Sequence, residues 1–189
     1  AAEKGSVTPA DLARLAMVHL QRYATDDAQQ GIEILDATAL QDRSRAQSWA
    51  VKSIIPDNSV GMFFGASKTF KSFVALDYAL HRCYGLPWLG RKTKRGVPVY
   101  IAAEGGAGIW KRIAAWHRLR HMDPAQMPMR VVTACLSLQT QAAELREAIE
   151  KTGVHPSDII IDTLSQTFAG EENSSSEVAA YLRVIGNEL

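Results

Sequence analysis

One stretch, Val60 to Leu80 (VGMFFGASKTFKSFVALDYAL), limits what this chain can fold into more than any other. It opens with a short apolar run, Val60–Phe64, that ends at Gly65. Lys71 and Ser72 follow six and seven positions after this glycine, and apolar side chains then recur at helical spacing. The stretch therefore predicts a strand, a tight loop and a helix with a lysine and a hydroxyl at its start.

The spacing of Gly65, Lys71 and Ser72 matches the phosphate-binding loop, in which Gly, four residues and Gly-Lys-Ser/Thr connect a strand to a helix. Phe70 stands where the second glycine of that motif belongs. Because a side chain resists the conformations that glycine allows, we expect Phe70 to take ordinary helical dihedral angles and to turn its ring away from the phosphates. Lys68 is a candidate for compensating positive charge.

A nucleoside triphosphate needs inward-facing backbone N–H groups, a helix N-terminus, a cation for the outer phosphates and Mg²⁺. This loop offers the N–H groups, the helix start and Lys71 as the cation. Ser72 would place its hydroxyl on the metal. The predicted residues of the ATP site are Gly65, Ala66, Ser67, Lys68, Thr69, Phe70, Lys71, Ser72 and Phe73.

Two later apolar runs end in carboxylates. Val97–Ala103 stops at Glu104, and Ile159–Ile161 stops at Asp162. Because the carboxyl ends of parallel strands meet at one edge of a sheet, we expect both carboxylates to face the phosphate loop. Asp162 would hold Mg²⁺ together with Ser72, as a Walker B aspartate does. Glu104 would orient or deprotonate the attacking water, so it and Lys71 are the candidate catalytic residues.

Alternation of strands and helices over more than a hundred residues predicts an α/β fold with a parallel sheet flanked by helices. Residues 49–189 form the predicted core. Residues 1–48 form a small N-terminal helical appendage, with one helix from Pro9 to about Tyr23, which packs on the core or docks on a neighbouring subunit. The expected strands of the core cover residues 60–64, 97–103, 129–133 and 159–161. The expected helices cover residues 71–84, 109–119, 142–151 and 178–185.

Bulk properties are those of an ordinary globular domain, with 47% hydrophobic and 22% charged residues. A net charge of +1 gives no global argument for nucleic acid or membrane. No apolar run approaches the roughly 20 residues of a membrane span, and the N-terminus is no signal peptide. Cys83 and Cys135 lack metal-ligand spacing, and we expect both to be buried reduced thiols of a cytoplasmic protein.

With these residues assembled, the sequence resembles RecA-like P-loop ATPases of the RepA and DnaB type, which include hexameric helicases of phages and plasmids. The matching segments are WAVKSIIPDNSVGMFFGASKTFKSFVALDYALH, GLPWLGRKTKRGVPVYIAAEGGAGIWKRIAAW and DIIIDTLSQTF. The resemblance implies that Glu104 polarises water, that Asp162 holds Mg²⁺ and that Arg112 lies behind Glu104. Phage-type relatives tolerate a Lys-x-x-Lys-Ser loop, as at Lys68–Ser72, without the second glycine.

Three functions fit these motifs. The preferred one is the Mg²⁺-dependent ATPase motor domain of a ring-forming replicative helicase, with single-stranded DNA and further copies of the chain, six in a hexamer, as partners. A recombination or annealing ATPase of the RecA/RadA kind and a non-motor ATP-binding regulatory module are the alternatives. RecA-like domains carry their sensor residue, arginine finger and DNA loops after Walker B. We therefore expect a fragment truncated after that region.

Overall fold

The computed structural model describes residues 19–20, 33–66, 68–104, 106–170 and 174–189. Its main sheet has the strand order β1-β6-β4-β5. The central strand β4 (Pro98–Ala102) pairs in parallel with β6 (Asp158–Asp162) and with β5 (Arg130–Val132). The expected parallel α/β sheet is thus confirmed for these three strands.

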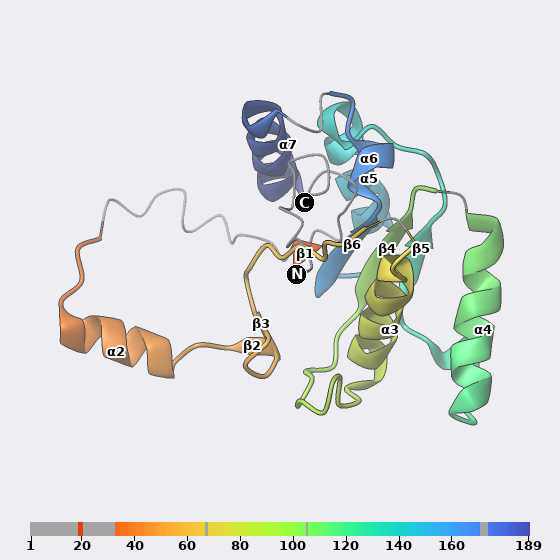
Figure 1. The fold of residues 1–189 in the computed structure, drawn as a ribbon, viewed down its shortest axis with the longest axis horizontal. Helices are drawn as coiled ribbons and strands as arrows, with labels where there is room; N and C mark the ends of the chain where they lie inside the picture. The colour runs from red at the N-terminus through yellow and green to blue at the C-terminus, as the bar shows by residue number, and fades with distance from the viewer. Residues whose placement is uncertain (1–18, 21–32, 67, 105, 171–173) are drawn as a thin grey trace, which may run out of the picture.

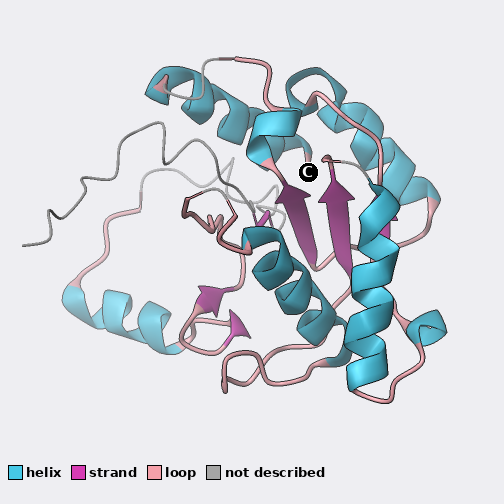
Figure 2. Cartoon of the chain, turned by 45° about the vertical axis from the view of Figure 1, so that its right-hand side comes forward, coloured by secondary structure: helices cyan, strands magenta, loops and turns pink. Residues whose placement is uncertain are grey.

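Helices cover both faces of this sheet (Figure 1, Figure 2). Successive residues of a strand point to opposite faces, so β4 and β6 contribute to two separate cores. On one face, Val99 and Ile161 pack with α5 (Leu138–Lys151) and α7 (Ser175–Glu188). On the other face, Tyr100 packs with buried side chains of the two remaining long helices. This double burial explains why both strands read as continuous apolar runs.

The second face is formed by α3 (Lys71–Tyr84) and α4 (Ile109–Leu119). α3 begins at Lys71, as the sequence predicts, and its buried residues run from Ala75 to Cys83. It ends because Gly85 adopts the left-handed conformation (φ 66°), in which glycine needs no strained side chain. Short helical turns complete the core: 3₁₀ turns η2 (Gly106–Gly108) and η3 (Pro124–Gln126), and helix α6 (Leu164–Thr167).

The predicted strand at Val60–Phe64 is wrong, because these residues form no strand. Phe63 is partly buried against the α3 core, but Val60, Met62 and Phe64 are exposed. A strand also needs a pairing partner, and the free edge of β6 is occupied instead by β1 (His19–Leu20), which pairs antiparallel. The segment therefore enters the Gly65–Ser72 loop without regular secondary structure.

The helix expected from Pro9 to about Tyr23 lies mostly outside the described residues. His19 and Leu20 of that range form strand β1 rather than helix. Without β1, this edge of β6 would present unpaired backbone N–H and C=O groups. Pairing with these groups outweighs the local helical pattern of residues 19–20.

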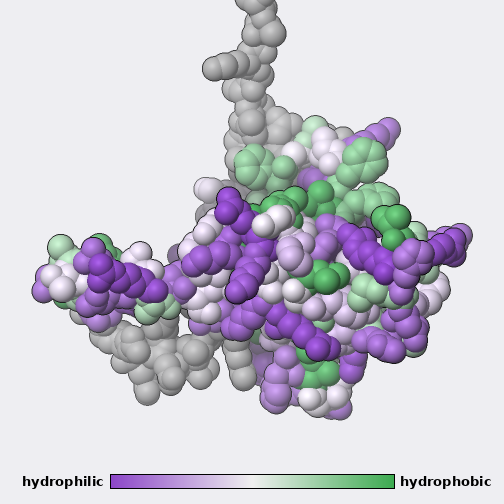
Figure 3. Space-filling view, turned by 90° about the horizontal axis from the view of Figure 1, so that it is seen from below, coloured by the Kyte–Doolittle hydropathy of each residue, from purple (hydrophilic) through white to green (hydrophobic). Residues whose placement is uncertain are grey.

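The N-terminal region ahead of the core contains one described helix, α2 (Ala37–Arg45), which has no buried residue. It stands apart from the body as a separate lobe with a largely hydrophilic surface (Figure 1, Figure 3). A small hairpin follows, β2 (Trp49–Val51) with β3 (Ile55–Pro56), and its Ala50 and Val51 are fully buried. The boundary between residues 48 and 49 stays a prediction.

A buried ion pair closes the amino end of β6. The Arg82 Nε donates to Asp158 Oδ2 at 2.9 Å, and both side chains are almost completely inaccessible. The Tyr78 hydroxyl donates to Asp158 Oδ1 at 2.6 Å, and the Arg82 guanidinium also donates to the carbonyl of Lys94. Burial, and then the Asp158 charge, raise the pKa of Tyr78 far above its ordinary value, so its hydroxyl stays a donor.

None of the described helices is both long and apolar enough to cross a membrane.

Candidate functional site

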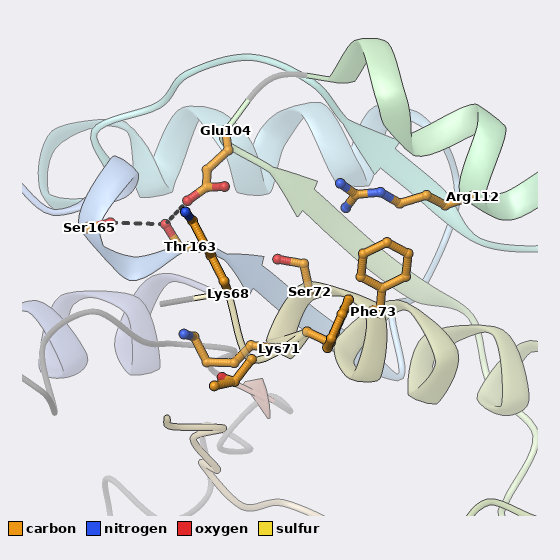
Figure 4. A pocket seen from close by; sticks show the side chains of 10 residues that line it. Lys68, Lys71, Ser72, Phe73, Glu104, Arg112, Thr163 and Ser165 are labelled. Carbon is orange, nitrogen blue, oxygen red and sulfur yellow. Dashed lines mark hydrogen bonds between the residues drawn. The ribbon is translucent and has the colours of Figure 1, made fainter. Parts of the chain in front are cut away.

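A cavity of about 510 Å³ lies where the carboxyl ends of β4 and β6 meet the start of α3 (Figure 4). The predicted loop residues from Lys68 to Phe73 meet Glu104 there, and Asp162 lines a smaller adjoining cavity of about 110 Å³ together with Ser72 and Glu104. The residues lining the larger cavity are Lys68, Thr69, Phe70, Lys71, Ser72, Phe73, Glu104, Arg112, Thr163 and Ser165.

The loop that enters α3 has a left-handed turn at Phe70 (φ 60°, ψ 23°), so the expectation of ordinary helical dihedral angles is wrong. Phe70 occupies the conformation that the missing glycine would favour, at a cost of about 1–2 kcal/mol. This turn lets the Phe70 carbonyl accept the backbone N–H groups of Phe73 and Val74 at 3.0 and 3.1 Å. The Phe70 ring is 70% exposed and contacts the Phe73 ring edge to face.

A side chain at the start of the same loop would be crowded. A Cβ atom on Gly65 would lie 3.0 Å from the Thr69 Oγ1. The Thr69 hydroxyl in turn donates to the Ala66 carbonyl at 2.8 Å, which holds the loop closed. Ser67, a further predicted loop residue, lies outside the described residues.

The two loop lysines behave differently. Lys71 folds back on its own loop, where its Nζ donates to the carbonyls of Gly65 and Ala66 at 2.9 and 2.8 Å. Lys68 is exposed, has a positive φ of 65° and extends in the direction of Glu104 and Thr163 (Figure 4). An anion in the cavity would thus meet one ammonium held by the loop and another at its rim.

Asp162 is partly buried at the end of β6, and two hydroxyls fix its carboxylate. The Ser72 Oγ donates to Oδ1 at 2.8 Å, and the Tyr100 hydroxyl donates to Oδ2 at 2.6 Å. Burial first, and then the negative charge of Asp162, raise the pKa of Tyr100 well above its ordinary value. Tyr100 is therefore a neutral hydrogen-bond donor throughout the physiological range.

Glu104 follows β4 and faces the same cavity from the opposite wall. The Thr163 Oγ1 lies 3.4 Å from the Glu104 Oε1. The same Thr163 oxygen also contacts the Ser165 hydroxyl at 3.0 Å (Figure 4). Arg112 reaches the cavity from α4, with its guanidinium 4.6 Å from the centre of the Phe73 ring. Glu104 is thus an accessible carboxylate in the cavity that the loop residues Lys68–Ser72 also line.

Ser72 and Asp162 fit a magnesium site. Both offer oxygen, which Mg²⁺ prefers, and they already lie within hydrogen-bond distance of each other. Within the described part of the chain, no three His, Cys, Asp or Glu side chains cluster as a metal cage. Mg²⁺ in nucleotide sites keeps several waters and binds through one or two protein groups and the substrate phosphates, so the two oxygen donors Ser72 and Asp162 match its needs.

Sequence reasoning missed three residues of this site: Tyr100, Thr163 and Ser165. Tyr100 carries a signal, because it is a phenol in a strand that is otherwise aliphatic, and a buried hydroxyl needs a partner. Thr163 and Ser165 are ordinary polar residues after a strand and carry none. Cys83 is buried as expected, whereas Cys135 is exposed, contrary to expectation.

Comparison with known proteins agrees with this geometry. A family model described as an AAA domain (AAA_25) matches residues 27–187, which is most of the chain. Searches of curated proteins and of solved structures gave no match. The match spans the loop at Gly65–Ser72 as well as Glu104 and Asp162. The chain therefore belongs to the AAA_25 family of RecA-like P-loop ATPase domains.

Proposed function

We propose that this chain is the ATP-binding and ATP-hydrolysing motor domain of a ring-forming replicative DNA helicase that acts on single-stranded DNA. The observation that carries the nucleotide chemistry is that loop residues Lys68–Ser72 and Glu104 line one cavity, while Asp162 lines an adjoining cavity together with Ser72 and Glu104. The motor role and the ring rest on the resemblance to the RepA and DnaB type.

Each side chain has a distinct part in this proposal. The loop backbone, Lys68 and Lys71 would bind the phosphates, for which Lys71 exchanges its bonds to the loop carbonyls. Ser72 and Asp162 would hold Mg²⁺, which neutralises the charge that develops on the phosphates. Glu104 would orient the attacking water or take its proton, and Thr163 is placed to orient Glu104.

Nucleotide binding is tested with Lys71→Ala. Removing the ammonium should abolish saturable binding of a fluorescent ATP analogue, while circular dichroism stays native. Lys151→Ala is the matched control, because Lys151 is an exposed lysine at the end of α5 whose ion pair with Glu147 is solvent-exposed. Equal affinity of Lys71→Ala and the unchanged protein would refute the loop assignment.

Hydrolysis is tested with Glu104→Gln, which keeps the shape but removes the base. Nucleotide affinity should persist, and turnover should fall about 10²–10⁴-fold, the usual contribution of a general base. Glu150→Gln, on the exposed side of α5, should leave turnover unchanged. Turnover that persists in Glu104→Gln would remove this residue from the catalytic role.

The motor role is tested by measuring ATP hydrolysis and strand displacement with and without single-stranded DNA. Stimulation by DNA together with strand displacement supports the helicase. DNA stimulation with filament formation or annealing, but no displacement, would support a recombination or annealing ATPase instead. ATP binding that DNA leaves unchanged would indicate a regulatory module.

A further inference from the structure

The carboxylate of Asp162 is held by two hydroxyls from two different elements, and only one of them belongs to the phosphate loop. Ser72 lies in the first turn of α3 and donates to Oδ1, whereas Tyr100 lies in the middle of β4 and donates to Oδ2. We propose that Tyr100 is a positioning residue that orients the Asp162 carboxylate toward Mg²⁺. This inference rests on the proposed nucleotide site.

Tyr100 is a rigid anchor. Its side chain is fully buried in the core beneath α3, and its backbone pairs within the parallel ladder opposite Ile160. The same hydroxyl lies 3.4 Å from the Ser72 carbonyl, so it bridges the end of β6 and the first turn of α3. A carboxylate otherwise turns about its own bond, and a donor on a strand limits that rotation at little further entropic cost.

The hydroxyls of Ser72 and Tyr100 would have different roles when Mg²⁺ binds at Asp162. The Ser72 oxygen is itself a candidate ligand, because its lone pairs could bind the cation while its proton stays on Oδ1. Tyr100 has no such second role, so its bond to Oδ2 would serve to hold the carboxylate in place. A phenol is uncharged, so it orients Asp162 without cancelling the negative charge that attracts Mg²⁺.

The test compares Tyr100→Phe with the unchanged protein. The measured quantity is the Mg²⁺ concentration that gives half-maximal binding of a fluorescent ATP analogue at fixed nucleotide. Loss of a group that orients a metal ligand typically lowers metal affinity 10- to 100-fold, so this midpoint should rise by about that factor. Nucleotide affinity in EDTA should be the same in both proteins, which a general loss of structure would not allow.

Tyr181→Phe is the matched control. Tyr181 is another fully buried tyrosine, and its hydroxyl contacts Thr167 at 2.6 Å on the opposite face of the sheet. This variant loses a comparable buried bond and should leave the Mg²⁺ midpoint unchanged. Tyr100→Leu serves as a second variant without the hydroxyl, and each protein is measured at a temperature where its circular dichroism is native.

An unchanged Mg²⁺ midpoint in Tyr100→Phe or Tyr100→Leu would overturn the positioning role. An equal rise in Tyr181→Phe would overturn it as well, because the effect would then be one of general stability. Failure of the proposed function looks different: the unchanged protein would itself show no saturable, Mg²⁺-dependent binding of the nucleotide.

Discussion

Strand β6 carries an aspartate at each end, and the two have opposite surroundings. Each accepts a tyrosine hydroxyl at 2.6 Å, Asp158 from Tyr78 and Asp162 from Tyr100. Asp158 is completely buried and is neutralised by the Arg82 guanidinium at 2.9 Å. Asp162 lines the smaller cavity of about 110 Å³ together with Ser72 and Glu104, and among the described residues no lysine or arginine forms an ion pair with it.

This difference separates a structural carboxylate from one available to a ligand. A buried charge must be paired, and Arg82 with its further bond to the Lys94 carbonyl pairs Asp158 within the protein. Within the described part of the chain, the side-chain hydrogen bonds to the Asp162 carboxylate come from two neutral hydroxyls, so its charge stays available for a cation. The same strand thus ties the core together at its amino end and carries the proposed metal ligand at its carboxyl end.

The largest expected effect on stability is at the amino end of β6, which the Arg82–Asp158 pair closes. Arg82→Ala should lower the free energy of unfolding by about 3–5 kcal/mol, because it leaves the Asp158 charge buried without its partner. Urea denaturation measures the change. Arg146→Ala is the control, since its pair with Glu188 is largely exposed and contributes at most about 1 kcal/mol. A loss below 1 kcal/mol in Arg82→Ala would remove the contrast between the two ends.

The two cysteines report on the two ends separately. Burial raises the pKa of Cys83, next to Arg82, to about 12, whereas Cys135 is exposed and lies against the Gln166 carbonyl just after β6. With a pKa of about 12 in place of the ordinary 9, Cys83 carries roughly a thousandfold less thiolate below pH 9 than an ordinary cysteine. Iodoacetamide at pH 8 should therefore modify Cys135 first.

Mass spectrometry of the labelled protein identifies which cysteine has reacted. Urea-unfolded protein should label at both positions equally, and Arg82→Ala should expose Cys83 to labelling. Because the folded state holds the Cys83 proton more tightly, this thiol favours folding below pH 9, and that contribution is lost as the pH rises toward 12. Rapid labelling of Cys83 in the native protein would contradict a closed amino end.

The smallest expected effect on stability is at the open end. Asp162→Asn loses one charge and weakens two hydroxyl contacts at a partly buried position, so the free energy of unfolding should change by less than about 1 kcal/mol. Urea denaturation under the conditions used for Arg82→Ala gives a direct comparison. A loss of 3 kcal/mol or more would show that Asp162 is a structural residue like Asp158.

Local sequence patterns predicted most of the core. α3, β4 and β6 are long apolar or periodic segments with clear ends, and the structure confirms them. Residues 60–64 have the same apolar character, but strand formation depends on a neighbouring strand that local sequence does not specify. The prediction of helical dihedral angles for Phe70 fails for a related reason. The turn into α3 determines the backbone conformation of Phe70 more strongly than its own side chain does.

The loop residues, Glu104 and Asp162 were predicted because each follows a recognisable strand or motif. The hydrogen bond from Tyr100 to Asp162 could not be predicted. The two residues lie 62 positions apart and meet through the register of β4 and β6. The pairing of Arg82 with Asp158, 76 positions apart, was invisible in the sequence for the same reason.

A manganese titration followed by electron paramagnetic resonance tests the central claim most directly, because bound Mn²⁺ loses the six-line signal of the free ion. In the presence of a non-hydrolysable ATP analogue, one Mn²⁺ should bind per chain, and Asp162→Asn should weaken this binding at least about tenfold while remaining folded. Mn²⁺ binding of the same strength in Asp162→Asn would contradict the assignment of the open end of β6 as the metal site.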